Sequence, residues 1–448
     1  MELIGKHASN QVLVYFIAAI VLGSILLSLP IAATTQNIAY IDALFTATSA
    51  VCVTGLIVLD TPNDFTLFGQ IVILVLIQLG GLGMMTFASA LVLSLGSRLS
   101  IRSRHGLTST IGSTPAVTTG SLIRSIILTT VLFEGIGAAI LFFGFRQTAG
   151  TSEALYHAIF QSVSAFCNAG FSTFSDSLEG FQSEPLVLLP IAGLIVAGGL
   201  GFVVIHELAN KVREPQLRLS LHSKLCLVSS VLLIVVGGIA FFVSEYGNSL
   251  GEMSQPVKVM NALFQSITTR TAGFNSIPQI SLTEFSILMT ILFMFIGGCP
   301  GSTAGGVKTT TVAIIGILGW RRLTGYRSLT AFRSAIKEDS ASRALAILVT
   351  GGVVVVAAFA AFIVAEGRSL SHEVARGNFV ESLFEVVSAF GTVGLSMGKT
   401  GMLDGAGKVI VILLMFTGRV GLLTLVLALA RPTRVGEITY LDEDIMVG

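Results

Sequence analysis

The sequence predicts an all-α polytopic membrane protein with four membrane helix–pore loop–membrane helix repeats around one pseudo-fourfold pore. Two observations lead to this fold class: the composition, and a motif that occurs four times. Of the 448 residues, 53% are hydrophobic and 11% are charged, and the mean hydropathy is +0.86. A soluble protein carries about 25% charged residues, so this composition is typical of a chain that lies mostly in a bilayer. The net charge of +1 gives no reason to expect a nucleic-acid partner.

The repeated motif is a short stretch that ends in glycine and a large apolar residue. Its copies read Val51-Cys52-Val53-Thr54-Gly55-Leu56, Phe166-Cys167-Asn168-Ala169-Gly170-Phe171, Thr269-Arg270-Thr271-Ala272-Gly273-Phe274 and Phe390-Gly391-Thr392-Val393-Gly394-Leu395. The glycines are 115, 103 and 121 residues apart. The apolar run before each copy ends in phenylalanine, at Phe45, Phe160, Phe264 and Phe384. Copies this regular mark four structural units.

Each unit has two apolar runs, one before and one after its pore loop, and runs of about 20 apolar residues can cross a bilayer. We expect unit one over residues 1–97, unit two over 98–210, unit three over 211–320, unit four over 321–431 and a cytoplasmic tail over 432–448. The pore loops lie at 41–56, 154–171, 257–274 and 379–395. The apolar runs lie at 11–31 and 65–95, 121–145 and 186–208, 221–243 and 285–318, and 344–364 and 408–430. The expected total is eight spanning helices and four re-entrant segments.

The positive charges predict the orientation, because Lys and Arg accumulate in cytoplasmic loops. The loops that join one unit to the next carry Arg98, Arg102 and Arg104, then Lys211, Arg213, Arg218 and Lys224, then Arg321, Arg322, Arg327, Arg333, Lys337 and Arg343. The loops beside the short apolar runs are acidic or mixed, with residues such as Asp60 and Asp176. Both termini are therefore expected in the cytoplasm, and the glycine motifs are expected to open to the outside.

The glycine motif has the chemistry of a cation site. Backbone in the hydrocarbon region must be hydrogen-bonded internally unless it lines a watery cavity or is enclosed by protein. Carbonyl groups of such a segment can replace the hydration shell of a cation, and glycine permits the backbone conformation that aims them inward. The preceding half-helix would add partial negative charge at its C-terminal end. The alternative is that each glycine only allows close helix packing, but four copies in the same context favour pore loops.

Unit three contains a second candidate site, an irregular stretch inside its second apolar run. Its residues are Gly297, Gly298, Cys299, Pro300, Gly301, Ser302, Thr303, Ala304, Gly305 and Gly306, followed by Lys308. So much Gly, Ser and Pro disfavours a continuous helix, and an irregular segment at this depth must line the cavity or be enclosed by protein. This stretch is expected just below the four glycine motifs, where it can block the path of a cation. A packing kink without motion is the alternative.

Arg419 is the lone charge of the last apolar run, and an intramembrane charge indicates function by default. Facing the cavity, it would repel a cation or hold the loop through backbone carbonyls. The alternative, a snorkelling arginine at the membrane surface, is less favoured because about ten further apolar residues follow before Arg431. Lys308 is either part of this site or a helix-end anchor. Glu134, within the first run of unit two, could pair with a cation or a polar neighbour.

The arrangement resembles the superfamily of K+ transporters that comprises the Trk, Ktr and plant HKT proteins, over nearly the whole chain. The phrases that carry this resemblance are Ile41-Asp42-Ala43-Leu44-Phe45-Thr46-Ala47, Val53-Thr54-Gly55-Leu56, Arg270-Thr271-Ala272-Gly273-Phe274-Asn275-Ser276 and Gly391-Thr392-Val393-Gly394-Leu395. Trk-type subunits usually carry two additional N-terminal helices. The sequence starts at unit one, so it is most similar to the B-type membrane subunit of bacterial Ktr systems (KtrB-like).

The resemblance implies uptake of K+, selected by backbone carbonyls of the four pore loops. The implied K+ filter residues are Cys52, Val53, Thr54, Gly55, Cys167, Asn168, Ala169, Gly170, Arg270, Thr271, Ala272, Gly273, Gly391, Thr392, Val393 and Gly394. The resemblance also implies that residues 297–306, with Lys308 and Arg419, form the gate. In HKT proteins a serine at the first filter glycine goes with Na+ transport, and here that position is Gly55. Only unit four keeps Thr-Val-Gly, so fewer well-ordered carbonyl rings than in a K+ channel are expected.

The resemblance also implies partners and a location. These are a bacterial plasma (inner) membrane, a homodimer with one pore per chain, and a cytoplasmic octameric nucleotide-binding regulatory subunit (KtrA-like). Na+ remains open as a coupling or activating ion, and a Na+ or unselective cation transporter of the same fold remains an alternative. An intramembrane enzyme is the alternative of a different class. No nucleophile–base set, zinc ligand set or phosphate loop stands out in the sequence, so we do not expect an enzyme.

Overall fold

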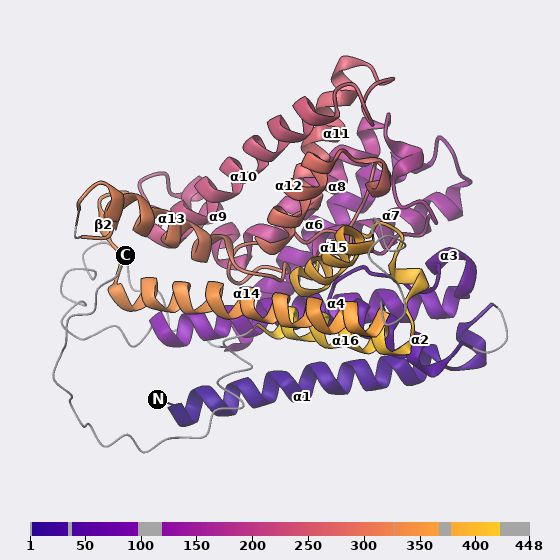
Figure 1. Ribbon diagram of the computed structural model, residues 1–448, viewed down its shortest axis with the longest axis horizontal. Coiled ribbons are helices and arrows are strands. Elements are labelled where there is room, and N and C mark those ends of the chain that lie inside the picture. Colours follow the sequence, from indigo (N-terminus) through magenta and orange to yellow (C-terminus); the bar gives the residue numbers. More distant parts are fainter. Residues whose placement is uncertain (1, 35–37, 97–118, 327, 367–377, 422–448) are drawn as a thin grey trace.

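The computed structural model describes residues 2–34, 38–96, 119–326, 328–366 and 378–421, and these residues are almost entirely helical (Figure 1). Five of the described helices are long and apolar enough to cross a membrane, or six if one bent pair counts as a single span. The five are α1 (Glu2–Leu27), α4 (Leu67–Gly96), α6 (Thr119–Phe145), α10 (Leu221–Glu245) and α14 (Glu338–Glu366).

A shorter helix stands between the two long apolar runs of each unit and ends at the glycine motif. These pore helices are α2 (Tyr40–Val51), α7 (Thr151–Cys167), α11 (Gln255–Thr268) and α15 (Asn378–Gly391). Their ends agree with the pore loops expected from sequence. Each stops where the next residues adopt positive φ, because a helix cannot continue through a left-handed residue.

The second apolar run is broken in units two and three. In unit two it is α8 (Pro185–Leu200) and α9 (Phe202–Arg213), bent by 101° at Gly201, where one helix over 186–208 was expected. In unit three, α12 (Glu284–Phe295) and α13 (Thr309–Leu323) flank a non-helical stretch. In unit four, α16 (Gly405–Val420) ends near the limit of the described residues. The expectation of one continuous helix is therefore wrong for unit two, whereas the break in unit three agrees with the irregular stretch predicted there.

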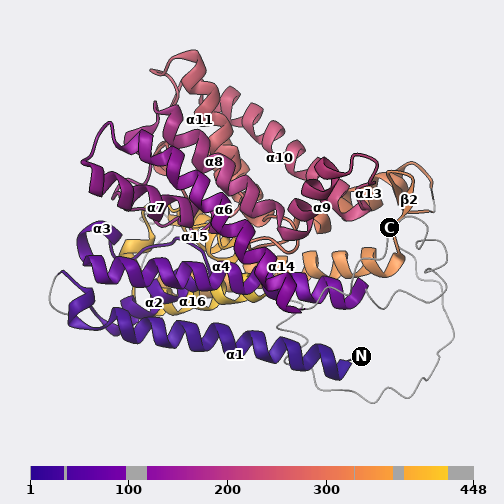
Figure 2. The ribbon, with the colours of Figure 1, turned by 180° about the vertical axis from the view of Figure 1, so that it is seen from behind.

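The helices follow one another around a closed circuit. The second helix of each unit packs against the pore helix of the next: α4 against α7, α8 against α11, and α12 against α15. The last helix, α16, packs against the first pore helix, α2, which closes the circuit. Figures 1 and 2 show α1 along one edge of the molecule, with α16 between it and α14, and α10 along the opposite edge.

Small elements mark the two ends of the bundle. At one end, beside α9 and α13, lies a hairpin of β1 (Thr330–Ala331) and β2 (Ser334–Ala335) (Figure 1). Its two turn residues, Phe332 and Arg333, have positive φ, as a tight hairpin turn requires. The other end carries α3 (Thr61–Asp64) and the short turns η1 (Pro30–Ala32), η2 (Glu179–Phe181), η3 (Gln279–Ser281) and η4 (Thr400–Met402).

The packing is that of a membrane protein. The largest apolar cluster gathers around the pore helices and includes Phe45, Phe160 and Phe390. The outer faces of the long helices instead expose large apolar side chains, such as Leu128, Val231 and Val356 at 60%, 59% and 69%. Exposed apolar surface over several whole helices is unfavourable in water and is suited to lipid.

Candidate functional site

The four glycine motifs share one backbone conformation. The residue two positions before each glycine is left-handed: Val53, Asn168, Thr271 and Thr392 have φ of 55°, 60°, 67° and 50°. The glycines themselves, Gly55, Gly170, Gly273 and Gly394, have φ of 93°, 70°, 79° and 94°. Left-handed backbone costs a side-chain-bearing residue about 1–2 kcal/mol, so its recurrence in all four units requires specific support.

That support comes from one hydroxyl residue near the end of each pore helix: Ser49, Ser164, Thr268 and Ser388. Their carbonyl oxygens accept from the N–H groups of Thr54, Ala169, Ala272 and Val393, at 2.8, 2.8, 3.1 and 2.8 Å. The Ser49 and Ser388 hydroxyls also accept from the N–H groups of Gly55 and Gly394, at 3.1 and 3.2 Å. The Ser164 and Thr268 hydroxyls donate to the carbonyls of Phe171 and Phe274, at 2.7 and 2.6 Å. Sequence analysis missed these anchors, although each lies five or six residues before its glycine.

The four motifs meet one another in cyclic order. A Cβ on Gly55 would lie 2.5 Å from the Ala169 carbonyl oxygen, and one on Gly170 would lie 2.9 Å from that of Ala272. Likewise, a Cβ on Gly273 would lie 2.5 Å from the Val393 oxygen, and one on Gly394 would lie 2.1 Å from the Thr54 oxygen. The glycine of each unit therefore touches the carbonyl of the next unit, and the fourth touches the first. We call these four joined motifs the ring. Only glycine fits these four positions.

Several polar atoms of the motifs are buried without a partner. The hydroxyls of Thr54, Thr271 and Thr392 have no hydrogen-bond partner within the described part of the chain. An unpaired buried hydroxyl is costly, and a bound cation or a water molecule would satisfy it. Arg270, at the start of its motif, is also buried, and its Nε lacks a partner among the described residues.

A cavity of about 280 Å³ lies on one side of the ring and is lined by Gly55, Gly170, Gly273 and Gly394. Its wall also carries the carboxylates of Asp60, Asp176 and Glu179. Burial, and then the charge of Asp176, raises the pKa of Glu179 above its ordinary value. We call this cavity the vestibule. An acidic, concave entrance concentrates cations.

The non-helical stretch of unit three, which we call the loop (residues 297–306), lies against the ring. The Thr303 hydroxyl donates to the Phe166 carbonyl at 3.2 Å, and a Cβ on Gly305 would lie 2.0 Å from the Thr392 hydroxyl. The loop is also tied to α8, because the N–H groups of Cys299 and Thr303 donate to the carbonyls of Gly199 and Gly198 at 2.9 and 3.2 Å. These contacts place the loop next to the end of the ring.

Two cations hold the loop: half-buried Lys308 and buried Arg419. The Lys308 ammonium donates to the carbonyls of Ala304 and Gly305, at 2.7 and 3.3 Å. Arg419, only 1% exposed, donates to the carbonyl of Thr303 and, at 2.8 Å, to that of Gly80 on α4. Arg419 thus connects units one, three and four. The snorkelling alternative is wrong for Arg419, since its guanidinium is enclosed by backbone carbonyls.

The glycines of the other second helices serve packing. A Cβ on Gly80, Gly198 or Gly418 would lie 2.0, 1.9 or 1.9 Å from the carbonyl oxygen of Val51, Phe166 or Phe390, at the end of the pore helix of the same unit. At these three positions glycine allows close packing of the second helix on the pore helix. In unit three, Gly297 instead meets the carbonyl of Gly305, within the loop.

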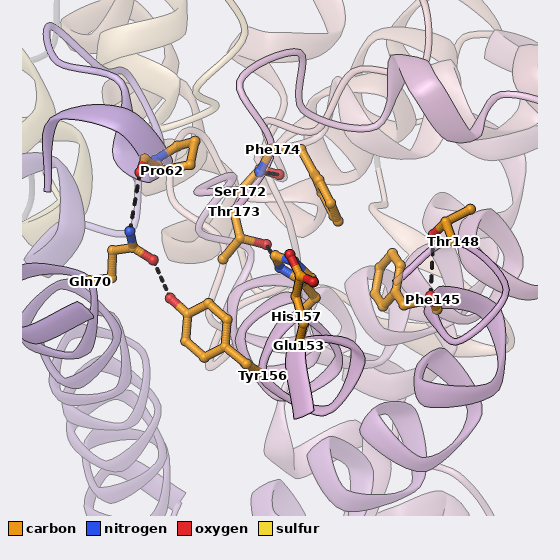
Figure 3. Close-up of polar contacts among 10 residues, drawn as sticks. All are labelled: Pro62, Gln70, Phe145, Thr148, Glu153, Tyr156, His157, Ser172, Thr173 and Phe174. Atoms are coloured by element: carbon orange, nitrogen blue, oxygen red, sulfur yellow. Dashed lines mark hydrogen bonds and ion pairs between the residues drawn. The ribbon is translucent and has the colours of Figure 1, made fainter. Parts of the chain in front are cut away.

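Polar side chains join unit one to unit two through Gln70 and Gln78 of α4. Tyr156 points toward Gln70 of α4 and donates to its amide oxygen, while His157 contacts the Thr173 hydroxyl at 2.7 Å (Figure 3). Deeper in the bundle, the Gln78 amide donates to Glu134 at 3.1 Å, and the Cys167 thiol donates to Gln78 at 3.3 Å. Glu134 therefore pairs with a polar neighbour. Cys167, which ends α7 in the second motif, also takes part in this contact.

Comparison with known proteins identifies relatives over nearly the whole chain. The family model TrkH, described as cation transport protein, matches residues 2–434. The chain is 39% identical to Ktr system potassium uptake protein B of Bacillus subtilis, over 97% of this chain and 95% of that protein. It is 36% identical to the protein of the same name in Vibrio alginolyticus, over 98% and 94%. It is also 36% identical to potassium/sodium uptake protein NtpJ of Enterococcus hirae, over 97% and 95%.

A solved structure is similar in fold. The potassium transporter TrkH of Vibrio parahaemolyticus superimposes with a TM-score of 0.75 at 20% sequence identity, covering 94% of this chain and 85% of that one. At this identity the likeness concerns the fold alone, and it agrees with the helical membrane architecture expected from sequence.

Proposed function

Because the chain belongs to the TrkH family of cation transport proteins, we propose that it is the ion-translocating subunit of a Ktr-type K+ uptake system. Two relatives at 36–39% identity carry the name of such a system and of its cargo. Membership of a transport family agrees with the expectation that the chain is not an enzyme. The cyclic contact of the four motifs carries the proposal, because it brings one backbone carbonyl from each unit close to the next motif, as a shared carbonyl site for a cation would require.

The ion path we propose runs from the vestibule through the ring. The carbonyls of Thr54, Ala169, Ala272 and Val393 would replace water around K+, and the unpaired hydroxyls of Thr271 and Thr392 would contribute below them. The remaining residues of the four motifs shape this path. They are Cys52, Val53, Gly55, Cys167, Asn168, Gly170, Arg270, Gly273, Gly391 and Gly394.

The gate we propose is the loop, residues 297–306, with Lys308 and Arg419. Its contacts with Phe166 and Thr392 support a position directly under the ring. The two cations hold it there and place positive charge in the path, which opposes entry of K+. Movement of the loop would break a small set of hydrogen bonds, so a modest stimulus could open it.

For the oligomeric state, the location and the partner subunit, the proposal follows the family resemblance. We propose a homodimer in the bacterial plasma membrane, with both termini cytoplasmic and an octameric nucleotide-binding subunit on the cytoplasmic side. The system names of the relatives support a partner subunit. Na+ as a coupling ion, or as an alternative cargo, also stays open, since one relative is named for both potassium and sodium.

The test is uptake of K+ and Rb+, with Na+ as competitor, in bacteria that lack their own K+ uptake systems. Gly394→Ser should weaken the preference for K+, because its side chain would collide with the Thr54 carbonyl. Gly325→Ser is the matched control: Gly325 is also left-handed, with φ of 77°, but no atom lies within 4 Å of the added Cβ and it does not line the vestibule. Deletion of residues 299–304 should raise the flux.

The proposal fails if wild-type protein reaches the membrane and transports neither ion. If Gly394→Ser and the deletion both behave like wild type, the motifs are packing elements. Flux of Na+ equal to that of K+ through purified wild-type protein would favour the unselective alternative.

A further inference from the structure

In units two, three and four, the residue after the phenylalanine of the pore helix ties that helix to the segment leaving the ring. In unit two, the Gln161 amide donates to the Ser172 hydroxyl at 2.7 Å, two residues after the motif glycine. In unit three, Gln265 and Gln279 exchange amide hydrogen bonds at 2.8 and 3.3 Å, six residues after the glycine. In both units, the residue after the pore-helix phenylalanine therefore supports the segment that follows the motif glycine.

Unit four differs because this residue is a carboxylate, Glu385. It is fully buried and accepts from the Ser396 hydroxyl at 2.8 Å and from the Thr400 hydroxyl. These two donors lie two and six residues after Gly394, at the positions used separately in units two and three. In unit one the residue is Thr46, whose hydroxyl has no partner in the described ranges. Glu385 is therefore the one acidic member of the four.

Both donors line the vestibule. A hydroxyl that gives its only proton to a carboxylate offers its oxygen to other groups solely as an acceptor. In unit two the direction of the hydrogen bond is reversed. The Gln161 amide donates to the Ser172 hydroxyl, which itself donates to the Ser177 carbonyl at 3.3 Å. The fourth side of the vestibule is thus backed by a carboxylate. Its Ser396 oxygen also accepts from the Gly398 N–H at 3.1 Å and lies 3.0 Å from the Thr400 hydroxyl oxygen.

Glu385 forms no ion pair within the described part of the chain, although the charge of Lys399 acts on it from a longer distance. Among the residues that the structure describes, no Lys, Arg or His nitrogen lies within 4.0 Å of its oxygens. The field of a buried, unpaired carboxylate is weakly screened on the side of the protein. It can therefore act on a cation in the adjoining vestibule.

We propose that Glu385 is a positioning residue for cation capture: through Ser396 and Thr400 it makes the fourth side of the vestibule attractive to a dehydrating monovalent cation. This inference rests on the proposed function of the ring and adds an asymmetry to it. The cation is captured on the unit-four side, next to the one motif that keeps Thr-Val-Gly.

The experiment compares KM and Vmax for Rb+ uptake in the full chain, normalised to the amount of protein in the membrane. Glu385→Gln keeps the shape and removes the charge, so KM should rise about three- to tenfold while Vmax stays within about twofold. Glu385→Asp keeps the charge and should stay within about twofold of wild-type KM. A role in folding alone would lower Vmax and protein level together and leave KM unchanged.

The matched control is Glu245→Gln. Glu245 is also a buried carboxylate, 1% exposed, and also accepts from a threonine hydroxyl, Thr283, at 2.7 Å, but neither residue lines the vestibule. Its KM should equal that of wild type. Adding Gln161→Glu to Glu385→Gln returns a carboxylate to the equivalent place in unit two and should recover at least half of the lost affinity.

Two results would overturn the proposal. One is a KM for Glu385→Gln equal to that of Glu245→Gln. The other is an increase in KM that Glu385→Asp shares in full, since charge would then not be the cause. Wild-type protein that takes up no Rb+ would instead refute the proposed function itself, so the two failures are distinguishable.

Discussion

At the scale of single residues, the site combines strained backbone with unsatisfied polar groups. The left-handed residues Asn168 and Thr392 and the unpaired hydroxyls of Thr54, Thr271 and Thr392 all work against stability. Such groups persist where their surroundings fix them and where a ligand completes them. Hydrogen bonds to Ser49 and Ser388 hold the left-handed backbone in place, and a bound cation would satisfy the unpaired hydroxyls.

Thr392→Val should separate stability from transport. The Thr392 hydroxyl has no partner in the described residues, so its removal should leave the thermal midpoint in detergent nearly unchanged. Transport should suffer, with the specificity for K+ falling about tenfold, or about 1.4 kcal/mol. Thr290→Val is the control: Thr290 is equally buried but donates to the Ser286 carbonyl at 2.8 Å. It should lower the midpoint and leave K+ affinity intact. The opposite pattern would remove Thr392 from the ion path.

Arg419 allows a test of charge against hydrogen bonding. Arg419→Ala should raise K+ flux about two- to tenfold, because both the positive charge and the ties to Thr303 and Gly80 are lost. Arg419→Gln retains a donor without the charge. If the charge forms the barrier, both variants raise flux, and if the hydrogen bonds hold the loop, only alanine does. Arg343→Ala, at an exposed arginine paired only with Asp339 across 4.0 Å, should change nothing. Wild-type flux in both Arg419 variants would contradict the gate.

At the scale of elements, breaks in the second helices place the loop. The non-helical stretch between α12 and α13 passes beside the sharp bend between α8 and α9. The two breaks touch, because the Phe202 N–H donates to the Gly301 carbonyl at 3.3 Å. Gly201, at the bend, has φ of 84° and ψ of 152°, a conformation open almost solely to glycine.

Gly201→Ala should therefore disturb the loop through a neighbouring element. The new Cβ would lie 2.9 Å from the backbone of Gly301, in addition to about 1–3 kcal/mol of backbone strain. We expect a lower thermal midpoint and an altered basal K+ flux. Gly193→Ala, in the same α8 helix with no atom within 4 Å of its added Cβ, should be neutral or stabilising by about 0.5–1 kcal/mol. Equal behaviour of the two variants would show that the bend does not control the loop.

At the scale of the whole molecule, the circuit closes between the last unit and the first. Lys408 at the start of α16 pairs with Asp42 of α2, Nζ to Oδ1 at 2.5 Å, and the two side chains are 16% and 17% exposed. Ring contact between Gly394 and Thr54 completes the same junction. This pair connects residues 366 positions apart and so ties the last unit directly to the first.

A double-mutant cycle with Asp42→Asn and Lys408→Met should reveal this coupling. Partial burial predicts an interaction of about 1–2 kcal/mol in unfolding experiments. The exposed pair of Asp339 and Arg343, with side chains 84% and 69% exposed, should give less than about 0.5 kcal/mol in the same cycle. A coupling energy near zero for Asp42 and Lys408 would mean that ring closure relies on packing alone.

The sequence by itself determined the class of the molecule, because hydropathy and a fourfold repeat are local properties. Apolar runs indicated the membrane helices, and the phenylalanine-to-glycine spacing predicted the pore loops. The Gly- and Pro-rich stretch from Gly297 predicted the break between α12 and α13. Each of these signals comes from chemistry within about 20 consecutive residues, so a reader of the chain can find it without neighbours.

Only the tertiary structure decided which groups meet. The bend at Gly201 has no local signal comparable to that of the loop, since it exists to accommodate Gly301 of another unit. The carbonyl that faces Gly394, the acceptors of Arg419 and the donors to Glu385 likewise lie on segments remote in sequence. Contacts of this kind depend on how four units close around one axis, and closure is a property of the packed whole.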